Sequence, residues 1–184
     1  MPAAFHIEVR PAVIGDADAL CDAHVAAWRV GYRGLFPDAL LDCDEFDSGR
    51  RAVWRAARWL GGDQQVFAAM IDGKVLGFAH VGAEREHSVP TRSGRGELYG
   101  FYNHPSTWGC GLAAVSMSVA EGWLAGQGYC DATLWVLRDN PRARHFYEKA
   151  GWASSGEESL WSGPSVAGQP MPAPIAEVRY SRSF

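Results

Sequence analysis

Short segments rich in apolar residues, several of them alternating with polar residues, are typical of β-strands that bury one face. The alternation is clear at 7–10 near the start of the chain and at 175–182 near its end. Asp72-Gly73 separates two further apolar segments, and this dipeptide is a strong signal for a two-residue hairpin turn. We therefore expect strands at 5–13, 65–71, 74–81, 97–103, 129–137, 152–160 and 175–182.

Other stretches carry apolar residues at spacings of three and four, which is typical of amphipathic helices. The first begins at Asp16, whose carboxylate can cap it, and ends at Gly31. Asn140 is expected to cap the last helix, with Pro141 well placed at its first position and Gly151 at its end. Two more helical stretches are expected, one at 38–60 with a break near 47–49 and one that runs from a turn at 108–113 to about residue 125.

The predicted elements follow the order β-α-α-β-β-β-α-β-α-β-β. Three strands precede the glycine-rich turn and a β-α-β unit follows it, an order that does not fit a doubly wound parallel sheet. The fold class we expect is α/β in the broad sense (α+β), with a mixed, mostly antiparallel sheet flanked by helices. At 184 residues the chain has the length of a single domain, which we take to be 1–184.

The composition argues against several classes of function. The formal net charge of −4 argues against binding to nucleic acid, and no apolar run reaches the roughly 18–20 residues that a membrane span needs. The N-terminal residues lack a basic region followed by an apolar stretch, so we expect no signal peptide and a cytoplasmic protein. The four cysteines form no C-x-x-C pair, so we expect reduced thiols and no metal site.

The segment 101–113 carries the first candidate chemistry, because a strand runs into a turn of small residues that opens a helix. Unpaired backbone N–H groups at such a helix start, together with the positive end of the helix dipole, suit an anion such as phosphate. Gly109 and Gly111 would let that anion approach the backbone. Neither the P-loop pattern nor the dinucleotide pattern G-x-G-x-x-G is present, and a plain tight turn explains these glycines equally well.

A second segment, 137–152, extends the pattern, and the two segments together resemble the GNAT superfamily of N-acetyltransferases. The resemblance covers 97–156 well, and two departures from the family pattern are Trp108, in place of Gln or Arg, and Trp152, in place of Phe. The acetyl-CoA loop of the family, Q/R-x-x-G-x-G/A, is similar to Trp108-Gly109-Cys110-Gly111-Leu112-Ala113. The second signature, N-x-x-A-x-x-x-Y-x-x-x-G-F, is matched by Asn140, Ala143, Tyr147, Gly151 and Trp152.

The resemblance implies that acetyl-CoA lies where the parallel strands 97–103 and 129–137 splay apart. The backbone of the first strand would bind the thioester carbonyl and pantetheine, Asn140 the pantetheine arm, and Tyr147 would lie near the sulfur. The turn would bind the pyrophosphate largely through its backbone, so Trp108 is tolerated there. The cofactor-binding residues that this implies are Phe101, Tyr102, Asn103, Trp108, Gly109, Cys110, Gly111, Leu112, Ala113, Ala114, Asn140 and Tyr147.

Such a reaction needs a neutral amine, its attack on the thioester carbonyl, and a proton for the departing thiolate. Glu97 is the leading base, because its strand borders the cofactor and many family members place a glutamate there. Tyr147 is the leading acid, since a phenol with a pKa near 10 holds its proton at neutral pH. A backbone N–H of the same strand would stabilise the carbonyl oxygen. An exposed charge and simple packing are the alternative interpretations, and His104 and His145 are weaker candidates for the base.

In the family, the first two helices overhang the acceptor cleft, and here they are rich in aromatic residues. We expect Trp28 and Tyr32 to contact the acceptor, because aromatic side chains can line an apolar or cation-binding pocket. Tyr99 is the third expected contact, since Tyr99 and Tyr102 are taken to face away from Phe101. Ordinary core packing is the alternative for each of these side chains.

The resemblance predicts an N-acetyltransferase that moves the acetyl group of acetyl-CoA to a primary amine of a small molecule or a peptide. A catalytically silent acyl-CoA-binding domain, acting as a sensor or interaction module, is the alternative. Acidic residues at 84–87 and 42–47 could attract a cationic amine. The loop 162–174 could wall off the acceptor site or serve a dimer contact, and a homodimer is left open.

Overall fold

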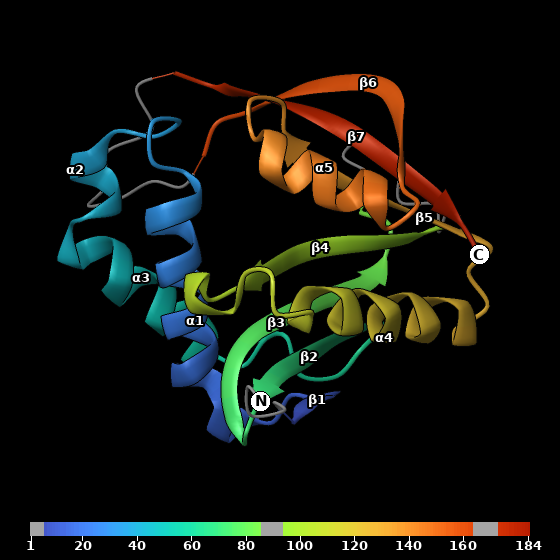
Figure 1. Ribbon diagram of the computed structural model, residues 1–184, viewed down its shortest axis with the longest axis horizontal. Coiled ribbons are helices and arrows are strands. Elements are labelled where there is room, and N and C mark those ends of the chain that lie inside the picture. Colours follow the sequence, from blue (N-terminus) through green and yellow to red (C-terminus); the bar gives the residue numbers. More distant parts are fainter. Residues whose placement is uncertain (1–5, 86–93, 164–172) are drawn as a thin grey trace, which may run out of the picture.

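The computed structural model describes residues 6–85, 94–163 and 173–184. At its centre is a seven-stranded sheet with the strand order β1-β2-β3-β4-β5-β7-β6 (Figure 1). Every neighbouring pair is antiparallel except β4 and β5, so the predicted mixed, mostly antiparallel sheet is confirmed. The strands are β1 (Ile7–Pro11), β2 (Gln64–Ile71), β3 (Lys74–Ala83), β4 (Gly96–Asn103), β5 (Asp131–Leu137), β6 (Ala153–Trp161) and β7 (Ile175–Ser183).

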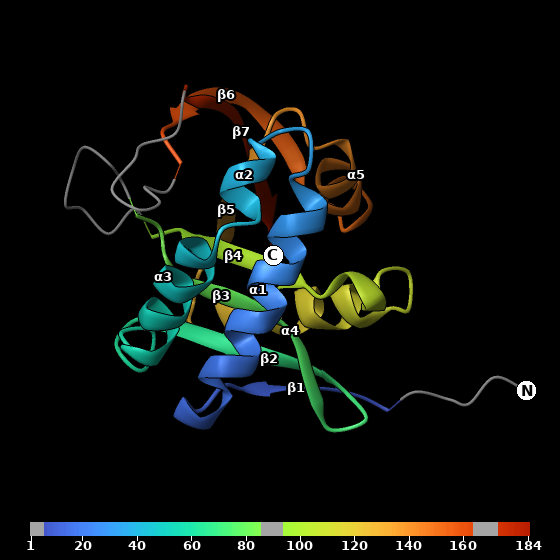
Figure 2. The same ribbon diagram turned by 90° about the vertical axis from the view of Figure 1, so that its left-hand side faces the viewer.

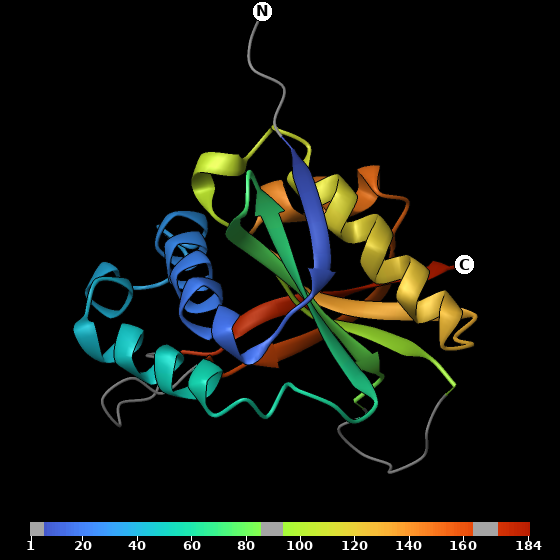
Figure 3. The ribbon, with the colours of Figure 1, turned by 90° about the horizontal axis from the view of Figure 1, so that it is seen from below.

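Helices cover both faces of this sheet. Figures 2 and 3 show α1 and α3 on one face, with α4 and α5 on the other. None of the helices in the described residues is long and apolar enough to cross a membrane. The helices are α1 (Ala17–Gly31), α2 (Asp38–Leu41), α3 (Asp44–Arg55), α4 (Leu112–Gly126) and α5 (Pro141–Lys149), with short 3-10 turns at Ile14–Asp16 and Pro105–Thr107.

Two apolar cores hold these layers together. Between α1, α3 and the sheet lies a core that includes Trp28 and Phe78, and between the sheet, α4 and α5 lies a second that includes Leu98 and Tyr180. Each large side chain that is fully buried contributes roughly 1.5–3 kcal/mol relative to exposure. Helices thus pack on both faces of the sheet, and a ligand can enter the sheet itself where two neighbouring strands separate.

The predicted hairpin at Asp72-Gly73 is confirmed. Both residues have positive φ angles, 48° and 79°, which is the signature of a type I′ turn. The turn joins β2 to β3 and brings Ile71 opposite Lys74.

The helical stretch expected at 38–60 is divided differently from the prediction. The break falls at Asp42 and Cys43, where Cys43 is extended (φ −82°, ψ 147°), and not at 47–49. Three acidic residues in the first turn favour a helix start at Asp44 because they meet the positive end of its dipole. Gly49 therefore stays inside α3, and the helix ends at Arg55, shortly before Ala57 takes a left-handed conformation (φ 54°).

The capping role expected of Asp16 is also wrong. Its carboxylate accepts the backbone N–H of Val13 at 2.8 Å and both ends of the Arg10 guanidinium, at 2.7 and 2.9 Å, and makes no capping hydrogen bond to α1. These bonds hold the pKa of Asp16 below its usual value, the hydrogen bond from Arg10 being the largest cause. The ion pair is favoured over capping because a guanidinium donates two charge-assisted hydrogen bonds to the carboxylate, whereas a cap would accept one neutral backbone N–H.

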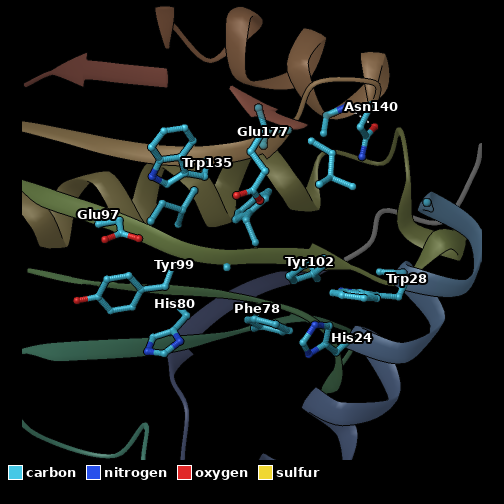
Figure 4. Close-up of a pocket in the computed structure, with 18 of the residues that line it drawn as sticks. His24, Trp28, Phe78, His80, Glu97, Tyr99, Tyr102, Trp135, Asn140 and Glu177 are labelled. Atoms are coloured by element: carbon cyan, nitrogen blue, oxygen red, sulfur yellow. Dashed lines mark hydrogen bonds between the residues drawn. The ribbon is translucent and has the colours of Figure 1, made fainter. Parts of the chain in front are cut away.

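The strands β4 and β5 separate soon after they begin. They are paired at only two positions, Gly96 with Ala132 and Glu97 with Thr133. Beyond Glu97 the edge of β4 that faces β5 has no strand partner. The divergence leaves an opening in the sheet, bounded by β4 below and β5 above in Figure 4.

Candidate active site

A large cleft occupies the opening between β4 and β5. It has a volume of about 1680 Å³ and is lined by side chains from α1, α3, β4, β5, α5 and β7. Ligand pockets commonly measure roughly 300–1,000 Å³. This cleft therefore has room for two ligands that meet inside the sheet.

One end of the cleft is bounded by the turn before α4. Gly109 and Gly111 have φ angles of 85° and 95°, a region that favours glycine, and the space beside the Cα of Gly109 is open for 4 Å. The N–H of Cys110 donates to the carbonyl of Thr107 at 3.2 Å, so this amide is already used. The first helical hydrogen bond after the turn runs from the N–H of Val115 to the carbonyl of Gly111, at 3.2 Å. The amides at 111–114 therefore have no partner inside the helix and can bind an anion, whereas that of Cys110, which the resemblance also implied, cannot do so without breaking its bond to Thr107.

Trp108 has a structural role that the family pattern does not suggest. Its indole N–H donates to the backbone carbonyl of Asn103 at 3.0 Å and so ties the turn to the end of β4. The guanidinium of Arg142 stacks on its ring, 3.2 Å from the centroid. Arg142 therefore lies at the same end of the cleft, and the sequence analysis missed it. Its position two residues after the Asn140 cap was the available signal.

Asn140 and Asn103 meet the cleft in different ways. Asn140 is buried, and its side-chain oxygen accepts the N–H of Ala143 at 3.1 Å, so the predicted helix cap is confirmed. Its side chain also lines the cleft (Figure 4). The side-chain oxygen of Asn103 is buried and has no partner among the described residues. A Cβ at Gly77 would collide with that oxygen, so glycine is required there.

Tyr147 reaches the cleft from α5. Its ring centroid is 6.5 Å from that of Phe101, and Trp152 and Tyr180 pack on its other sides. Burial, with a smaller contribution from Tyr102, raises the pKa of Tyr147 well above its ordinary value. The phenol therefore holds its proton throughout the neutral range, so in a proton transfer it can serve as the acid.

Glu97 lies at the other end of the opening, where β4 and β5 are still paired. Its side chain is buried and accepts the backbone N–H of Arg85 at 2.7 Å and the guanidinium of Arg85 at 2.7 Å. Phe101 is four positions along β4 from Glu97, which corresponds to at most about 13 Å of extended strand. The candidate base and the candidate acid therefore stand at different points along the cleft.

The three residues expected at the acceptor fall into two places. Trp28 and Tyr32 belong to one aromatic cluster with Tyr102, and the hydroxyls of Tyr32 and Tyr102 are 3.1 Å apart. Tyr99 instead lies beside His80 and Glu97 (Figure 4), and its hydroxyl donates to the carbonyl of Ala83. The structure brings Trp28 and Tyr32 together but separates Tyr99 from them.

A bulge in β4 decides where these side chains point. His80 pairs with Gly100 and Val81 with Leu98, so Tyr99 is the extra residue. A strict period of two would place Tyr99 on the same face as Phe101, but the bulge turns it to the face of Tyr102. Phe101 packs against α5 on the other face, with its ring 5.4 Å from that of Phe146. The expectation that both tyrosines oppose Phe101 is therefore confirmed.

Three further cleft residues could not be predicted from the sequence. Glu177 points from β7 into the opening (Figure 4), Arg50 lines the cleft from α3, and His24 lines it from α1. Burial, aided by Arg50, lowers the pKa of His24 well below its ordinary value, so this imidazole is neutral. The alternation in 175–182 placed Glu177 opposite the apolar side chains of its strand. The alternation could not show which side chains face Glu177 across the cleft.

The acidic mouth considered for a cationic acceptor is not found in the described part of the chain. Asp42 pairs with Arg33 and Asp47 with Arg29, and neither carboxylate lines the cleft. Glu84 lines the cleft, but it is buried and accepts hydrogen bonds from Thr133 and Arg179. Residues 86 and 87, and most of the loop 162–174, lie outside the described residues.

The two histidines considered as weaker bases do not line the cleft. His104 accepts the N–H of Ser106 at 3.2 Å and its Nδ1 lies 2.7 Å from the hydroxyl of that serine, so it caps the short turn at Pro105–Thr107. His145 is exposed on α5. Among the described residues, no cluster of three or more His, Cys, Asp or Glu side chains is placed to hold a metal ion.

Comparison with known proteins gives a family and a set of similar folds. The model of the acetyltransferase (GNAT) family matches residues 23–152, and no curated protein matches the chain. Among solved structures, PaiA N-acetyltransferase from Thermoplasma acidophilum, in complex with coenzyme A, is similar at 15% identity with a TM-score of 0.70, over 97% of this chain and 99% of that one. YncA from Salmonella typhimurium, with acetyl-CoA, is similar at 18% identity and a TM-score of 0.66, over 97% and 94%.

A third structure is similar over almost the whole chain. It is a GCN5-related N-acetyltransferase from Rhodopseudomonas palustris, at 19% identity and a TM-score of 0.71, with 99% of each chain covered. At such identities the likeness concerns the fold, and the match of the family model over most of the chain carries the assignment.

Proposed function

Because the chain belongs to the acetyltransferase (GNAT) family, we propose that it moves the acetyl group of acetyl-CoA to a primary amine by direct attack. The observation that carries this proposal is the opening between β4 and β5. There an unpartnered strand edge, the open amides at the start of α4 and the buried phenol of Tyr147 all border one cleft. That combination suits a long anionic thioester ligand whose reacting end lies inside the sheet.

The residues present fit acetyl-CoA at the turn end of the cleft. The amides at 111–114 would hold the pyrophosphate, since no side chain crowds Gly109 and a carbon at Gly111 would stand 4.0 Å from Ile7. Arg142, whose guanidinium stacks on the ring of Trp108, adds a positive charge there. The free edge of β4 from Phe101 to Asn103 would pair with the pantetheine amides, and Asn140 would bind the same arm. Acetyl-CoA itself supplies the activated acyl group.

Each catalytic group has a proton to move. Glu97 would accept the proton of the acceptor ammonium, through water where the amine lies closer to Tyr147 than to the carboxylate. The amine nitrogen then forms a bond to the acyl carbon while the carbon–sulfur bond breaks. Tyr147 would donate its phenolic proton to the departing thiolate, and the second proton, lost by the nitrogen as the amide forms, would return to the phenolate through water. A backbone N–H of β4 beyond Glu97 would stabilise the negative charge on the acyl oxygen.

A screen of acceptors tests the proposal. Purified protein is mixed with acetyl-CoA and polyamines, aminoglycosides, amino acids or peptides with a free N-terminus, and release of free thiol is measured. We expect turnover with at least one amine, reduced in Tyr147→Phe and Glu97→Gln.

The alternative, a silent acyl-CoA-binding domain, predicts a different result of the same screen. It would give a thermal shift with acetyl-CoA, and no amine would raise thiol release above the rate without acceptor. The absence of both a thermal shift and turnover would contradict the proposal and its alternative together.

A further inference from the structure

Arg50 lies in the aromatic part of the cleft without a carboxylate partner. It is half-buried on α3, with its guanidinium carbon 4.4 Å from the ring centroid of Trp28 and 5.3 Å from that of Phe46. Aromatic faces favour a cation, but they give its in-plane N–H groups no acceptor. Within the described residues no oxygen accepts a hydrogen bond from this guanidinium, and no carboxylate forms an ion pair with it.

The other arginines of the same helix provide the contrast. Arg51 pairs with Asp22 at 2.7 Å, and Arg55 pairs with Asp18 at 2.8 Å. Both point toward the outer surface of α1, which supplies a carboxylate for each. Arg50 points the other way, into the cleft, and α1 offers it only His24 and Trp28. The helix thus pairs its outward arginines and leaves the inward one unpaired.

The surroundings of Arg50 make this arrangement costly without a ligand. Burial lowers the pKa of its guanidinium, which means that its charge is poorly solvated. A buried charge is tolerated when an opposite charge or several hydrogen bonds compensate it. His24 cannot compensate, since it is neutral, and its Nδ1 already accepts the indole N–H of Trp54 at 3.3 Å. An anion entering this part of the cleft would therefore be held strongly.

We infer that Arg50 binds a carboxylate of the acceptor, so that the acceptor is an amine that also carries an acid group. Rings of Trp28, Tyr32 and Tyr102 would hold the apolar part of the same molecule. One of the paired hydroxyls of Tyr32 and Tyr102 keeps a free O–H hydrogen after the two bond to each other, and it can donate to the same acid group. The amine would then point along the cleft toward Tyr147.

This inference rests on the proposed function and deepens it by naming the acceptor class: amino acids with apolar side chains and a free carboxylate. It narrows the expected acceptor, a primary amine of a small molecule or a peptide, to one that also carries an acid group. A polyamine has no group for Arg50 and would bring a second positive charge beside it. Such an acceptor should therefore be disfavoured by like-charge repulsion.

The first test compares leucine, methionine, phenylalanine and tryptophan with their carboxamides as acceptors. We expect kcat/KM to be at least about 10-fold higher for the acids than for the amides, because a hydrogen-bonded charge is lost in the amide. Arg50→Gln should abolish this ratio, mainly through KM for the acid, and Arg50→Lys should restore part of it. Arg55→Gln, on the exposed side of the same helix, is the matched control and should keep the wild-type ratio.

The second test measures binding without turnover. The indole N–H of Trp28 is buried, has no acceptor, and lies next to Arg50, so its ¹⁵N–¹H signal reports on this site. Trp28→Phe assigns the signal. With coenzyme A present, adding phenylalanine should shift it in the wild-type protein and in Arg55→Gln. The shift should be absent in Arg50→Gln and with phenylalaninamide.

The two tests separate the two claims. Turnover of amines with equal kcat/KM for acids and amides would overturn the inference and leave the proposed function standing. A carboxylate-dependent and Arg50-dependent shift of Trp28, with no turnover of any amine, would support the inference and contradict the proposed function. If neither acids nor amides shift the Trp28 signal, the inference fails regardless of turnover.

Discussion

The cleft has two parts, here called the cofactor arm and the acceptor arm, which are lined by different kinds of groups. The cofactor arm, formed by the turn at 108–114 with the starts of α4 and α5, consists largely of backbone groups and small residues. The acceptor arm, formed by Trp28, Tyr32, Arg50 and Tyr102, consists of side chains from α1, α3 and β4. The first arm suits a ligand that is the same in every member of a family. The second can change with single substitutions, so we expect it to set the specificity for the acceptor.

The largest effect should come from the cofactor arm. Gly111→Val places a β-branched residue at φ 95° and a side chain beside the open amides. We expect the affinity for coenzyme A, measured by calorimetry, to fall by more than about 100-fold. Gly122→Ala on the same helix has open space around its new carbon and should bind coenzyme A within about twofold of the wild type. Equal losses in both variants would contradict a backbone-built pyrophosphate site.

Tyr147→Phe should affect chemistry and leave binding intact. Removing the phenolic proton donor should lower kcat by about 100-fold, the lower end of general acid catalysis, with KM for acetyl-CoA changed by less than about threefold. Because burial raises the pKa of Tyr147, the wild-type kcat should not fall between about pH 8 and 10 through loss of this proton. Tyr129→Phe, outside the cleft, is the control. A Tyr147→Phe enzyme with full kcat would remove the phenol from the mechanism.

Glu97→Gln should have a smaller effect of about 10-fold on kcat/KM at neutral pH, since the carboxylate stands away from Tyr147 and can act through water. Glutamine keeps the shape of the side chain and can still accept the N–H of Arg85. A higher pH should recover part of the loss because more of the amine is then neutral. Glu45→Gln, on the outer side of α3, serves as the comparison. Unchanged kcat/KM at every pH would exclude Glu97 as the base.

The last prediction concerns the stability of the sheet beside Tyr99 and not the rate of the reaction. Burial, with a contribution from Arg85, lowers the pKa of His80 to about 4. Between that value and the usual 6.5 the unfolded chain binds the proton more readily, so the free energy of unfolding falls as pH drops through this window. The loss should reach at most about 3 kcal/mol. Denaturant unfolding at pH 7 and pH 4 measures it.

His80→Gln isolates this contribution. The amide N–H of glutamine reaches the position of the histidine Nε2, which lies 2.9 Å from the side-chain oxygen of Gln64, but it does not titrate. The pH dependence of the variant should be weaker than that of the wild-type protein, and His24 should account for part of what remains. Identical pH dependence in both proteins would contradict a buried neutral His80.

The same contrast explains what could be predicted from sequence. The order of elements, the hairpin at Asp72-Gly73 and the turn at Gly109–Gly111 follow from local patterns, because each depends on adjacent residues. The hydroxyl pair of Tyr32 and Tyr102 joins residues 70 positions apart, so no local pattern reveals it. The position of Arg50 could not be predicted for the same reason. The helix α3 carries several arginines, and only its packing in the folded protein shows which one faces the cleft.

Two predictions, the break of a helix and a helix cap, failed for the same kind of reason. The break of the second helical stretch was misplaced because Ser48-Gly49 looks like a turn, whereas the acidic residues after Cys43 favour a new helix start. Asp16 was expected to cap α1, but its carboxylate pairs with Arg10 on β1 instead. In both cases a competing electrostatic interaction overrode a local propensity.

A crystal structure with bound coenzyme A tests the central claim most directly. We predict that the pyrophosphate lies on the amides of Gly111 to Ala114 and that the thiol reaches Tyr147 through the opening between β4 and β5. The cluster of Trp28, Tyr32 and Arg50 should remain free for the acceptor. A coenzyme A molecule that avoids the turn, or that fills the aromatic cluster, would contradict the division of the cleft into these two arms.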